Sequence, residues 1–351
     1  MSKQNTYALG IDLGGTKTLA AVVDIMTGEV VGSARKRTRA ERGQDFVSQR
    51  TLEVATAALE VAKVPAEDLV AVGVGAAGQI DRQAGTVVDA PNLGVHDFPL
   101  RSILGNQFNR PVAVGNDVEV AALGEYLYGA GRGYKNFVCL FVGTGIGSGI
   151  VQNGRMYTGL TGTAGEVGHM VIHAGGRICG CGGRGCLEAY ASRTAITKVI
   201  MAEIHHGRPS LLADDAQRQL RQGETIIRSG ILANAIQQKD ELTIEAVSEA
   251  ADYLGIALGS LMNAYNPDCI ILGGGVIEAI DLLFETAVHR ARTTALAEPA
   301  RKTPILRAKL GDFSGVVGAS CLGAQAAGFQ FHLGDGTGVA RAKAATAQEN
   351  A

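Results

Sequence analysis

The 351-residue sequence has no tryptophan, only 8 prolines and no excess of charge of either sign. The 32 Lys and Arg residues against 34 Asp and Glu give a formal net charge of −2. The chain therefore lacks the basic field that nucleic acid or an anionic membrane would need. It also lacks any run of 18 apolar residues, which excludes an ordinary membrane-spanning helix. We expect neither nucleic acid nor a membrane as a partner.

An export signal is missing as well. The residues from Met1 to Thr6 are polar and lead directly into a strand-like segment, whereas a secretion signal needs an apolar stretch. Six cysteines in a chain without such a signal favour metal binding over disulfides. We therefore expect a cytoplasmic protein.

Glycine, in contrast, is abundant. Its 48 of 351 residues are about twice the usual share of about 7%. They gather in clusters beside predicted strands, unlike the glycines of a linker or a disordered tract. They indicate a backbone that turns tightly and approaches a ligand closely.

Two strand–turn–strand units of similar pattern begin at Tyr7 and at Asn136, which hints at a duplicated nucleotide-binding domain in an α/β protein. The chain length suits two domains. Periodicity and turn residues predict strands over 7–13, 19–24, 29–32, 70–74, 111–114, 136–142, 149–152, 155–158 and 269–272, and helices over 48–62, 244–265 and from 276 onward.

The first glycine turn contains chemistry suited to a phosphate. Gly14 and Gly15 let backbone N–H groups face phosphate oxygens, Thr16 and Lys17 add donors and charge, and Asp12 can face a Mg²⁺ ion. The segment is not a Walker loop, because G-x-x-x-x-G-K-[ST] is missing. An ordinary glycine hairpin is the alternative for so short a pattern.

The second glycine turn, over 143–149, does not complete the dinucleotide pattern G-x-G-x-x-G, because Ser148 occupies its last position. In dinucleotide-binding proteins an acidic residue about 20 positions after the glycines contacts the ribose. Here Glu166 stands at about that spacing, but it belongs to another glycine-rich segment. A hydride-transfer enzyme therefore fits poorly. As a second phosphate hairpin, the turn would bring Thr144 and Gly145 to a nucleotide.

Asn116 and Asp117 follow a predicted buried strand, at the end where open α/β sheets bind ligands. A carboxylate there can accept the proton of a substrate hydroxyl, and the amide can hold a sugar by hydrogen bonds. Helix capping ahead of the apolar run over 118–127 is the alternative, and it is common for this pair of residues.

Three cysteines and a histidine form the most specific pattern. His169, Cys179, Cys181 and Cys186 are separated by nine, one and four residues, so that all four ligands of a tetrahedral Zn²⁺ lie on one compact loop. Without an obvious open position, the metal would be structural. His173 is a competing ligand, and buried or redox cysteines are the alternative to a metal site.

Two acidic residues flank this loop, Glu166 before His169 and Glu188 after Cys186. If zinc stiffens the loop, both carboxylates can accept hydrogen bonds from sugar hydroxyls. Solvated surface glutamates are the alternative.

Together these segments resemble the ROK family of bacterial sugar kinases and transcriptional repressors. The resemblance runs from about Tyr7 to Gly323 and is carried by Asp12 to Lys17, Gly115 to Asp117, Gly165 to His169, Cys179 to Glu188, and Gly273 to Gly275. It implies the two-domain actin-like ATPase fold, in which two α/β domains close on a central cleft. Many members phosphorylate a hexose with ATP and Mg²⁺.

With that fold we expect a small N-terminal α/β domain over 1–115, completed by a C-terminal helix over 315–330. A larger α/β domain would cover 116–314 and contain the zinc loop over 169–186. Residues 331–351 would form a flexible tail.

The resemblance implies that Asp117 is the catalytic base at the sugar 6-hydroxyl. Sugar contacts are implied for Asn92, Asn116, Asp117, Glu166, His169 and Glu188. Nucleotide contacts are implied for Gly14, Gly15, Thr16, Lys17, Thr144, Gly145, Gly273, Gly274 and Gly275. The family often has a tryptophan shortly after the Asn92-Leu93 pair, and Gly94-Val95-His96 stands there instead.

The expected reaction is ATP-dependent phosphorylation of glucose to glucose 6-phosphate. Only six residues precede the first strand, where the repressor branch carries a helix-turn-helix, and the zinc loop argues against the polyphosphate-dependent branch. A kinase for N-acetylglucosamine or N-acetylmannosamine is one alternative, and a non-catalytic sugar-sensing protein is another. The resemblance also implies a homo-oligomer, either a dimer or a tetramer.

Overall fold

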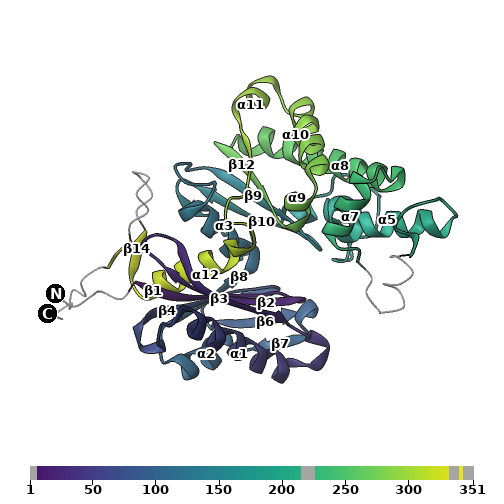
Figure 1. The fold of residues 1–351 in the computed structure, drawn as a ribbon. Coiled ribbons are helices and arrows are strands. Elements are labelled where there is room, and N and C mark those ends of the chain that lie inside the picture. The colour runs from purple at the N-terminus through teal and green to yellow at the C-terminus, as the bar shows by residue number, and fades with distance from the viewer. Residues whose placement is uncertain (1–5, 215–225, 332–339, 343–351) are drawn as a thin grey trace. The chain divides into compact units, whose positions relative to one another are not determined.

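The computed structural model describes residues 6–214, 226–331 and 340–342. The chain divides into two compact units, each with its own sheet (Figure 1). The first unit comprises Met1–Gly133 and Asp312–Ala351, and the second comprises Tyr134–Gly311.

The first unit is built on a five-stranded sheet in the order β3-β2-β1-β4-β8. β1 pairs with β4, and β4 with β8, in parallel, whereas β1, β2 and β3 form an antiparallel meander. The carboxyl ends of β1, β4 and β8 therefore meet at one edge. The strands are β1 Tyr7–Leu13, β2 Lys17–Asp24, β3 Glu29–Arg37, β4 Leu69–Ala76 and β8 Val112–Asn116.

Helices cover both faces of this sheet (Figure 1). Successive side chains of β1 point to opposite faces of the sheet. Leu9 and Ile11 therefore join the core between the sheet and α1, while Gly10 faces α12. A Cβ atom at Gly10 would overlap the carbonyl of Val316, so this glycine lets α12 lie directly on the strand. The helices are α1 Gln44–Ala62, α2 Leu100–Phe108, α3 Asp117–Tyr128 and α12 Ser314–Ala326.

Two small sheets complete the first unit. A three-stranded sheet contains β5 Gln79–Asp81, β6 Thr86–Ala90 and β7 Val95–Phe98. β14 Phe329–Phe331 pairs antiparallel with β15 Ala340–Ala342. The predicted tail over 331–351 is therefore wrong at these positions, and the rest of it lies outside the described residues. Short 3-10 turns cover Ala40–Arg42, Ala66–Asp68, Pro91–Leu93 and Gly311–Phe313.

The second unit has a sheet in the order β11-β10-β9-β12-β13. Its core joins the apolar side chains of β9, β10 and β12 to the buried faces of α8 and α10. The strands are β9 Phe137–Val142, β10 Ile146–Gln152, β11 Arg155–Met156, β12 Cys269–Gly273 and β13 Ile305–Arg307. The helices are α4 Glu188–Ala191, α5 Arg193–His205, α7 Ser229–Gln237, α8 Glu241–Tyr265, α9 Gly275–Ala279, α10 Asp281–Thr294 and α11 Ala297–Lys302, with a 3-10 turn at Val167–His169.

The boundary between the units differs from the predicted one. It lies after Gly133 rather than after residue 115, because α3 packs on α12 of the first unit. A Cβ at Gly124 of α3 would overlap the Ser314 carbonyl, which shows how closely the two helices approach. The predicted participation of the C-terminal helix in the N-terminal unit agrees with the position of α12.

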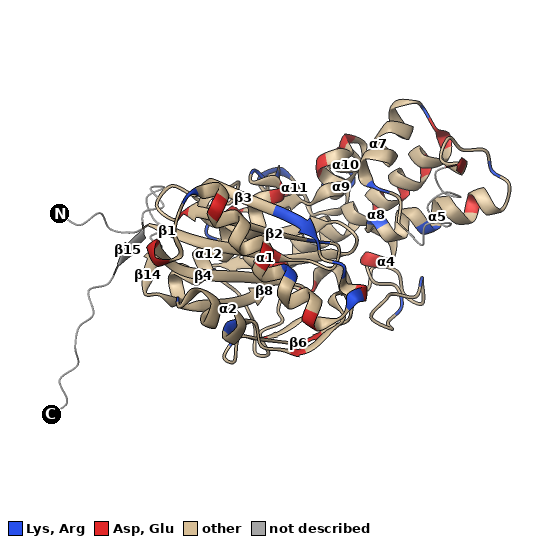
Figure 2. Ribbon diagram, turned by 60° about the horizontal axis from the view of Figure 1, so that its bottom comes forward, with Lys and Arg blue, Asp and Glu red and all other residues tan. Residues whose placement is uncertain are grey.

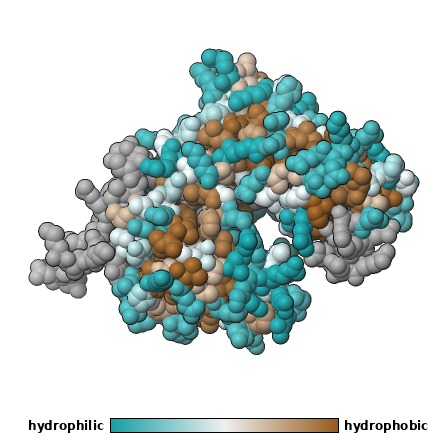
Figure 3. All heavy atoms as spheres, in the orientation of Figure 1, coloured by the Kyte–Doolittle hydropathy of each residue, from teal (hydrophilic) through white to brown (hydrophobic). Residues whose placement is uncertain are grey.

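Charged residues of both signs are interspersed in the described structure (Figure 2), and on the visible face hydrophilic residues border patches of apolar residues (Figure 3). No helix in the described ranges is long and apolar enough to cross a membrane.

Candidate functional site

Two carboxylates lie at the carboxyl edge of the first unit's sheet. Asp12 stands opposite Gly75 of β4, and Gly75 stands opposite Gly115 of β8, two residues before Asp117. Asp117 approaches β4 closely at Gly75, because a Cβ atom on this glycine would come within 3.3 Å of the Asp117 Cα. The sheet register therefore brings together the predicted Mg²⁺-facing residue and the predicted base.

The electrostatics of Asp12 indicate a place for a cation. The pKa of Asp12 is raised to about 7, chiefly by burial and also by the nearby Asp117 and Asp312, while Lys17 opposes the rise. A bound cation would favour the charged carboxylate and remove this penalty. Oxygen ligands from carboxylates suit Mg²⁺, so Asp12 and its acidic neighbours fit that ion.

Cations gather beside the first glycine turn. Lys17 Nζ lies 2.7 Å from Asp312 Oδ1, and an Arg35 nitrogen lies 3.2 Å from Asp312 Oδ2. The Lys17 ammonium holds the pKa of Asp312 below its usual range. Lys and Arg residues occupy the end of β3 (Figure 2), where Arg37 pairs with Lys17 in the strand register. This end of the hairpin has the charge that phosphate groups require.

The turn itself is tied to its surroundings on both sides. Its ends are joined by the Gly14 N–H, which donates to Lys17 O over 3.1 Å. Thr38 holds the turn through its hydroxyl, which donates to Gly14 O over 2.6 Å, and through its N–H, which donates to Thr16 O over 3.0 Å. A Cβ at Gly15 would overlap the backbone of Asn92. A predicted phosphate contact and a predicted sugar contact thus lie side by side.

Asn116 is the N-cap of α3. Its Oδ1 accepts from Val118 N over 3.0 Å and from Glu119 N over 3.3 Å. The capping alternative is therefore confirmed for this residue. Because the oxygen is used in the cap, Asn116 can offer a ligand chiefly its amide N–H groups. Asp117 is the first helical residue, where the helix N-terminus favours its negative charge.

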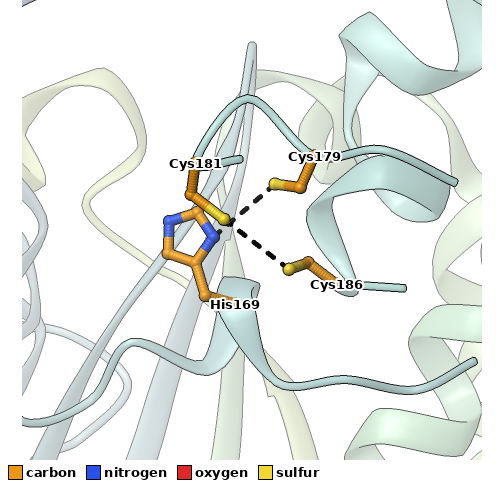
Figure 4. A group of neighbouring side chains, drawn as sticks. All are labelled: His169, Cys179, Cys181 and Cys186. Carbon is orange, nitrogen blue, oxygen red and sulfur yellow. Dashed lines mark hydrogen bonds between the residues drawn. The ribbon is translucent and has the colours of Figure 1, made fainter. Parts of the chain in front are cut away.

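The four predicted metal ligands of the second unit lie together (Figure 4). Their ligand atoms all lie within 4.8 Å of one another. Cys181 Sγ and Cys186 Sγ are 3.8 Å apart, and Cys179 Sγ lies 3.7 Å from His169 Nδ1. With Zn–S bonds of about 2.3 Å and Zn–N bonds of about 2.0 Å, a tetrahedral site would separate such atoms by about 3.5 to 3.8 Å. The donor set and spacing fit a structural zinc, and all these cysteines are free of disulfides.

The competing ligand His173 is placed elsewhere. Its ring stacks on Tyr190 with centroids 5.6 Å apart, and its Nδ1 lies 3.2 Å from the Tyr253 hydroxyl. The guanidinium of Arg177 lies 4.6 Å from the Tyr190 ring on the same loop. The geometry therefore favours His169 over His173 as the fourth ligand, and His173 belongs to an aromatic cluster with Tyr190 and Tyr253.

Glu188 joins the cysteine cluster to the second glycine turn. One of its carboxylate oxygens accepts from Ile146 N over 2.9 Å, and the other lies 3.8 Å from Cys179 Sγ. A Cβ at Gly145 would overlap the same carboxylate. Glu166 differs, because its exposed carboxylate makes no hydrogen bond or ion pair among the described residues.

The second glycine turn and the Gly273–Gly275 segment leave the same edge of their sheet. β9 and β12 are parallel, with Phe141 opposite Gly273, so Thr144 and Gly274 follow neighbouring strand ends. Gly274 has a φ of 92°, which favours glycine, and a Cβ there would overlap the carbonyl of Val142.

Sequence reasoning missed several residues at these two edges. Asp312 reaches Lys17 across 295 positions of the chain, and Arg193 reaches Thr144 across 49. No local pattern announces such contacts. Thr38 directly follows β3, and β3 pairs with β2, which begins at the first glycine turn. This pairing is the signal by which the contact of Thr38 with the turn could have been predicted.

Comparison with known proteins gives consistent matches over nearly the whole chain. The sequence profile of the ROK family matches residues 8–326. The glucokinase of Halalkalibacterium halodurans is 35% identical over 317 residues, which are 90% of this chain and 94% of the relative.

Two solved structures are also similar. A ROK family glucokinase from Streptomyces griseus, crystallised with glucose and AMPPNP, has a TM-score of 0.77 and 31% identity, covering 91% of this chain and 99% of that one. A ROK hexokinase from Thermus thermophilus has a TM-score of 0.72 and 34% identity, covering 91% and 98%.

Proposed function

The chain belongs to the ROK family, and on that premise we propose that it is an ATP-dependent hexokinase that converts glucose to glucose 6-phosphate. Its α/β fold is the actin-like ATPase fold of the ROK sugar kinases. The single observation that carries the proposal is the meeting of Asp12, Asp117 and the Gly14–Lys17 turn at one sheet edge.

In the proposed reaction Asp117 accepts the proton of the sugar 6-hydroxyl. The hydroxyl oxygen then forms its bond to the γ-phosphorus of ATP as the bond to the ADP oxygen breaks. Helix α3 positions the base at its first residue, and the cap formed by Asn116 fixes that end of the helix.

The proposed nucleotide contacts follow the family resemblance. We assign phosphate binding to the backbone of Gly14 and Gly15, to Thr16 and Lys17, and to Thr144 and Gly145, with Gly273, Gly274 and Gly275 near the adenosine. Bound Mg²⁺ would neutralise phosphate charge, and Asp12 is the residue that we assign to it. Lys17, now paired with Asp312, supplies a cation that phosphate oxygens can share.

We assign sugar contacts to Asn92, Asn116, Glu166, His169 and Glu188, as the family membership implies. Their amide and carboxylate groups suit a molecule with many hydroxyls. We also propose that the metal of the His169–Cys186 loop is structural Zn²⁺, because its donor set is closed. We also propose a cytoplasmic location, which the use of ATP and the six free thiols support.

A sugar panel tests the proposal. Purified full-length protein with Mg²⁺ and ATP is assayed for ADP release on glucose, mannose, N-acetylglucosamine and N-acetylmannosamine. Glucose is expected to react fastest, with the product oxidised by glucose-6-phosphate dehydrogenase. A faster reaction with an N-acetylated sugar would show that this sugar, and not glucose, is the preferred substrate. If no sugar of the panel accelerated ADP release, the proposal that the protein is a hexokinase would be refuted.

A further inference from the structure

A cationic side chain lies beside the 143–145 turn of the second unit. Arg193 is the first residue of α5, and its N–H donates to Gly143 O over 2.9 Å. One terminal nitrogen of its guanidinium donates to Thr144 Oγ1 over 2.7 Å, and the other lies 3.4 Å from Ser229 Oγ. Arg193 therefore joins the turn to the beginning of α7.

The charge of Arg193 is not balanced by an acidic side chain. Within the described part of the chain no carboxylate lies within ion-pair distance of it, and its buried Nε has no hydrogen-bond partner. Other arginines of the unit, such as Arg177 and Arg208, pair with glutamates. Burial lowers the pKa of the Arg193 guanidinium, as expected for a cation without a counter-ion. An anion at this place would relieve the cost of burying that charge.

The hydrogen bonds of Thr144 leave it able to contact the same anion. A threonine hydroxyl has one proton to donate and two lone pairs. Because Arg193 donates to this oxygen, the hydroxyl proton remains available for another acceptor. The Thr144 carbonyl is occupied by the Thr194 hydroxyl, which donates to it over 2.7 Å.

Space for a ligand adjoins these groups. A Cβ built at Gly275 would meet nothing within 4 Å except Ser229 Oγ, at 4.0 Å. Ser229 is the residue that Arg193 approaches, and Gly275 follows β12 at the edge where the 143–145 turn follows β9. Ligands of open α/β sheets bind outside the carboxyl ends of the strands.

We propose that Arg193 is a phosphate-binding residue for the nucleotide. Its guanidinium donates to oxygens of the phosphate chain and holds Thr144 so that its hydroxyl donates to the same chain. Arginine suits this role because its planar group can donate to hydroxyls and phosphate at once. The inference rests on the proposed function, since it takes the ligand to be ATP or ADP.

Binding of ADP and of adenosine to the zinc-loaded full-length protein tests the proposal. Arg193→Gln is compared with wild type, and Arg208→Gln serves as a control because it removes an arginine just beyond the other end of α5. We expect the Kd for ADP to rise roughly 10- to 100-fold in Arg193→Gln, the loss of a charge-assisted hydrogen bond, while adenosine binding stays within about threefold. The control should bind both like wild type.

The comparison separates a phosphate contact from support of the turn. If Arg193 only supports the turn, ADP and adenosine lose affinity equally, and the proposal is overturned. Unchanged ADP binding overturns it as well. Should Arg193→Gln fail to fold, Arg193→Lys replaces it. Lysine keeps the charge but cannot donate to both hydroxyls and to a phosphate at once. The lysine variant should therefore bind ADP several-fold more weakly than wild type and bind adenosine with unchanged affinity. Wild-type affinity for ADP in the lysine variant contradicts the proposal.

The same measurements distinguish this inference from the proposed function. A wild-type protein that binds ADP but phosphorylates no hexose refutes the function, and the variants still decide the role of Arg193. A wild-type protein that phosphorylates glucose, with Arg193→Gln binding ADP equally well, refutes the inference alone. A wild-type protein that binds no ADP refutes the inference too.

Discussion

Asp117 is the residue on which turnover depends most directly in the proposed reaction. Asp117→Asn keeps the size of the side chain and the beginning of α3 but removes the proton acceptor. We expect kcat to fall about 10²- to 10⁴-fold while glucose binding and the melting temperature change little. Steady-state kinetics and calorimetric titration with glucose measure both. A variant with wild-type kcat would exclude Asp117 as the base.

Asp12 carries a conflict between stability and function. Its pKa in the folded protein, about 7, lies above the ordinary value of 3.8, so the folded state binds the proton more tightly. Folding stability therefore falls as pH rises from about 4 to about 7, and the loss is complete above pH 7.

The substitution Asp12→Asn removes the ionisable carboxyl group and with it the loss of folding stability at high pH. Without metal, we expect the variant to melt roughly 3 to 10 °C above wild type at pH 8 and to lose most of that advantage at pH 5. Turnover at saturating Mg²⁺ should nevertheless drop strongly. Thermal scans at both pH values in the presence of a chelator check the sign. An advantage that is equal at pH 5 and pH 8 would contradict the raised pKa.

Single residues also show where sequence reasoning ends. The four proposed zinc ligands lie within 18 positions of one another, and their spacing predicted that they form a cluster. For Asn116 the sequence left a helix cap and a sugar contact open, because both roles use the same side-chain amide at the same place. Asp312 and Arg193 could not be found, because their partners are brought to them only by the packing of the sheets.

Among the elements, the metal loop has the most direct test. Glu188 connects the cysteine cluster to Ile146, so loss of the metal should loosen the 143–145 turn as well as the loop. We expect one zinc per chain in wild type and less than half of that in Cys181→Ser, with a melting temperature lower by more than about 5 °C. Elemental analysis and thermal scans measure both.

An exposed threonine provides the control for that variant. Thr161→Ser changes a side chain in the neighbouring exposed segment and should retain the zinc and the melting temperature. Carefully purified wild-type protein without zinc would contradict the assignment of the metal.

The contact of α12 with α3 depends on a missing side chain. A Cβ at Gly318 would overlap the Val120 carbonyl of α3, whereas a Cβ at Gly105 in α2 would meet only Val112 at 3.9 Å. We expect Gly318→Ala to destabilise the protein by about 1 to 3 kcal/mol and Gly105→Ala to stabilise it by up to about 1 kcal/mol. Denaturant unfolding compares the two, and equal effects would contradict the close packing.

The elements were predicted unevenly for a physical reason. β1 was predicted with its observed bounds, and the long helix ending at Tyr265 was found by its regular apolar spacing. The small sheet of β5, β6 and β7 was missed, because short strands carry little alternation. The abundance of glycine was related to tight turns and to close approach of a ligand, whereas Gly10 instead lets α12 pack closely on β1.

At the scale of the whole molecule, the two units differ in how the chain builds them. The second unit is continuous, Tyr134–Gly311, and has its own core, whereas the first requires α12 from the other end of the chain. We therefore expect the fragment 134–311 to fold with zinc and the fragment 1–133 to remain largely unfolded. Circular dichroism and amide proton NMR compare the fragments.

Addition of a peptide covering residues 312–331 provides the control for that comparison, because it restores α12. Recovery of structure by fragment 1–133 with the peptide would support the role of α12. A fragment 1–133 that folds fully by itself would contradict it.

The position of α12 also has a consequence for the order of events during protein synthesis. While the ribosome translates the middle of the message, Asp12 has already emerged on its strand, yet Gly315, which packs against its carboxyl group, has not been made. The second unit, which is continuous in the sequence, can fold in that interval. We therefore expect the nascent chain to complete its first unit only once α12 has left the exit tunnel.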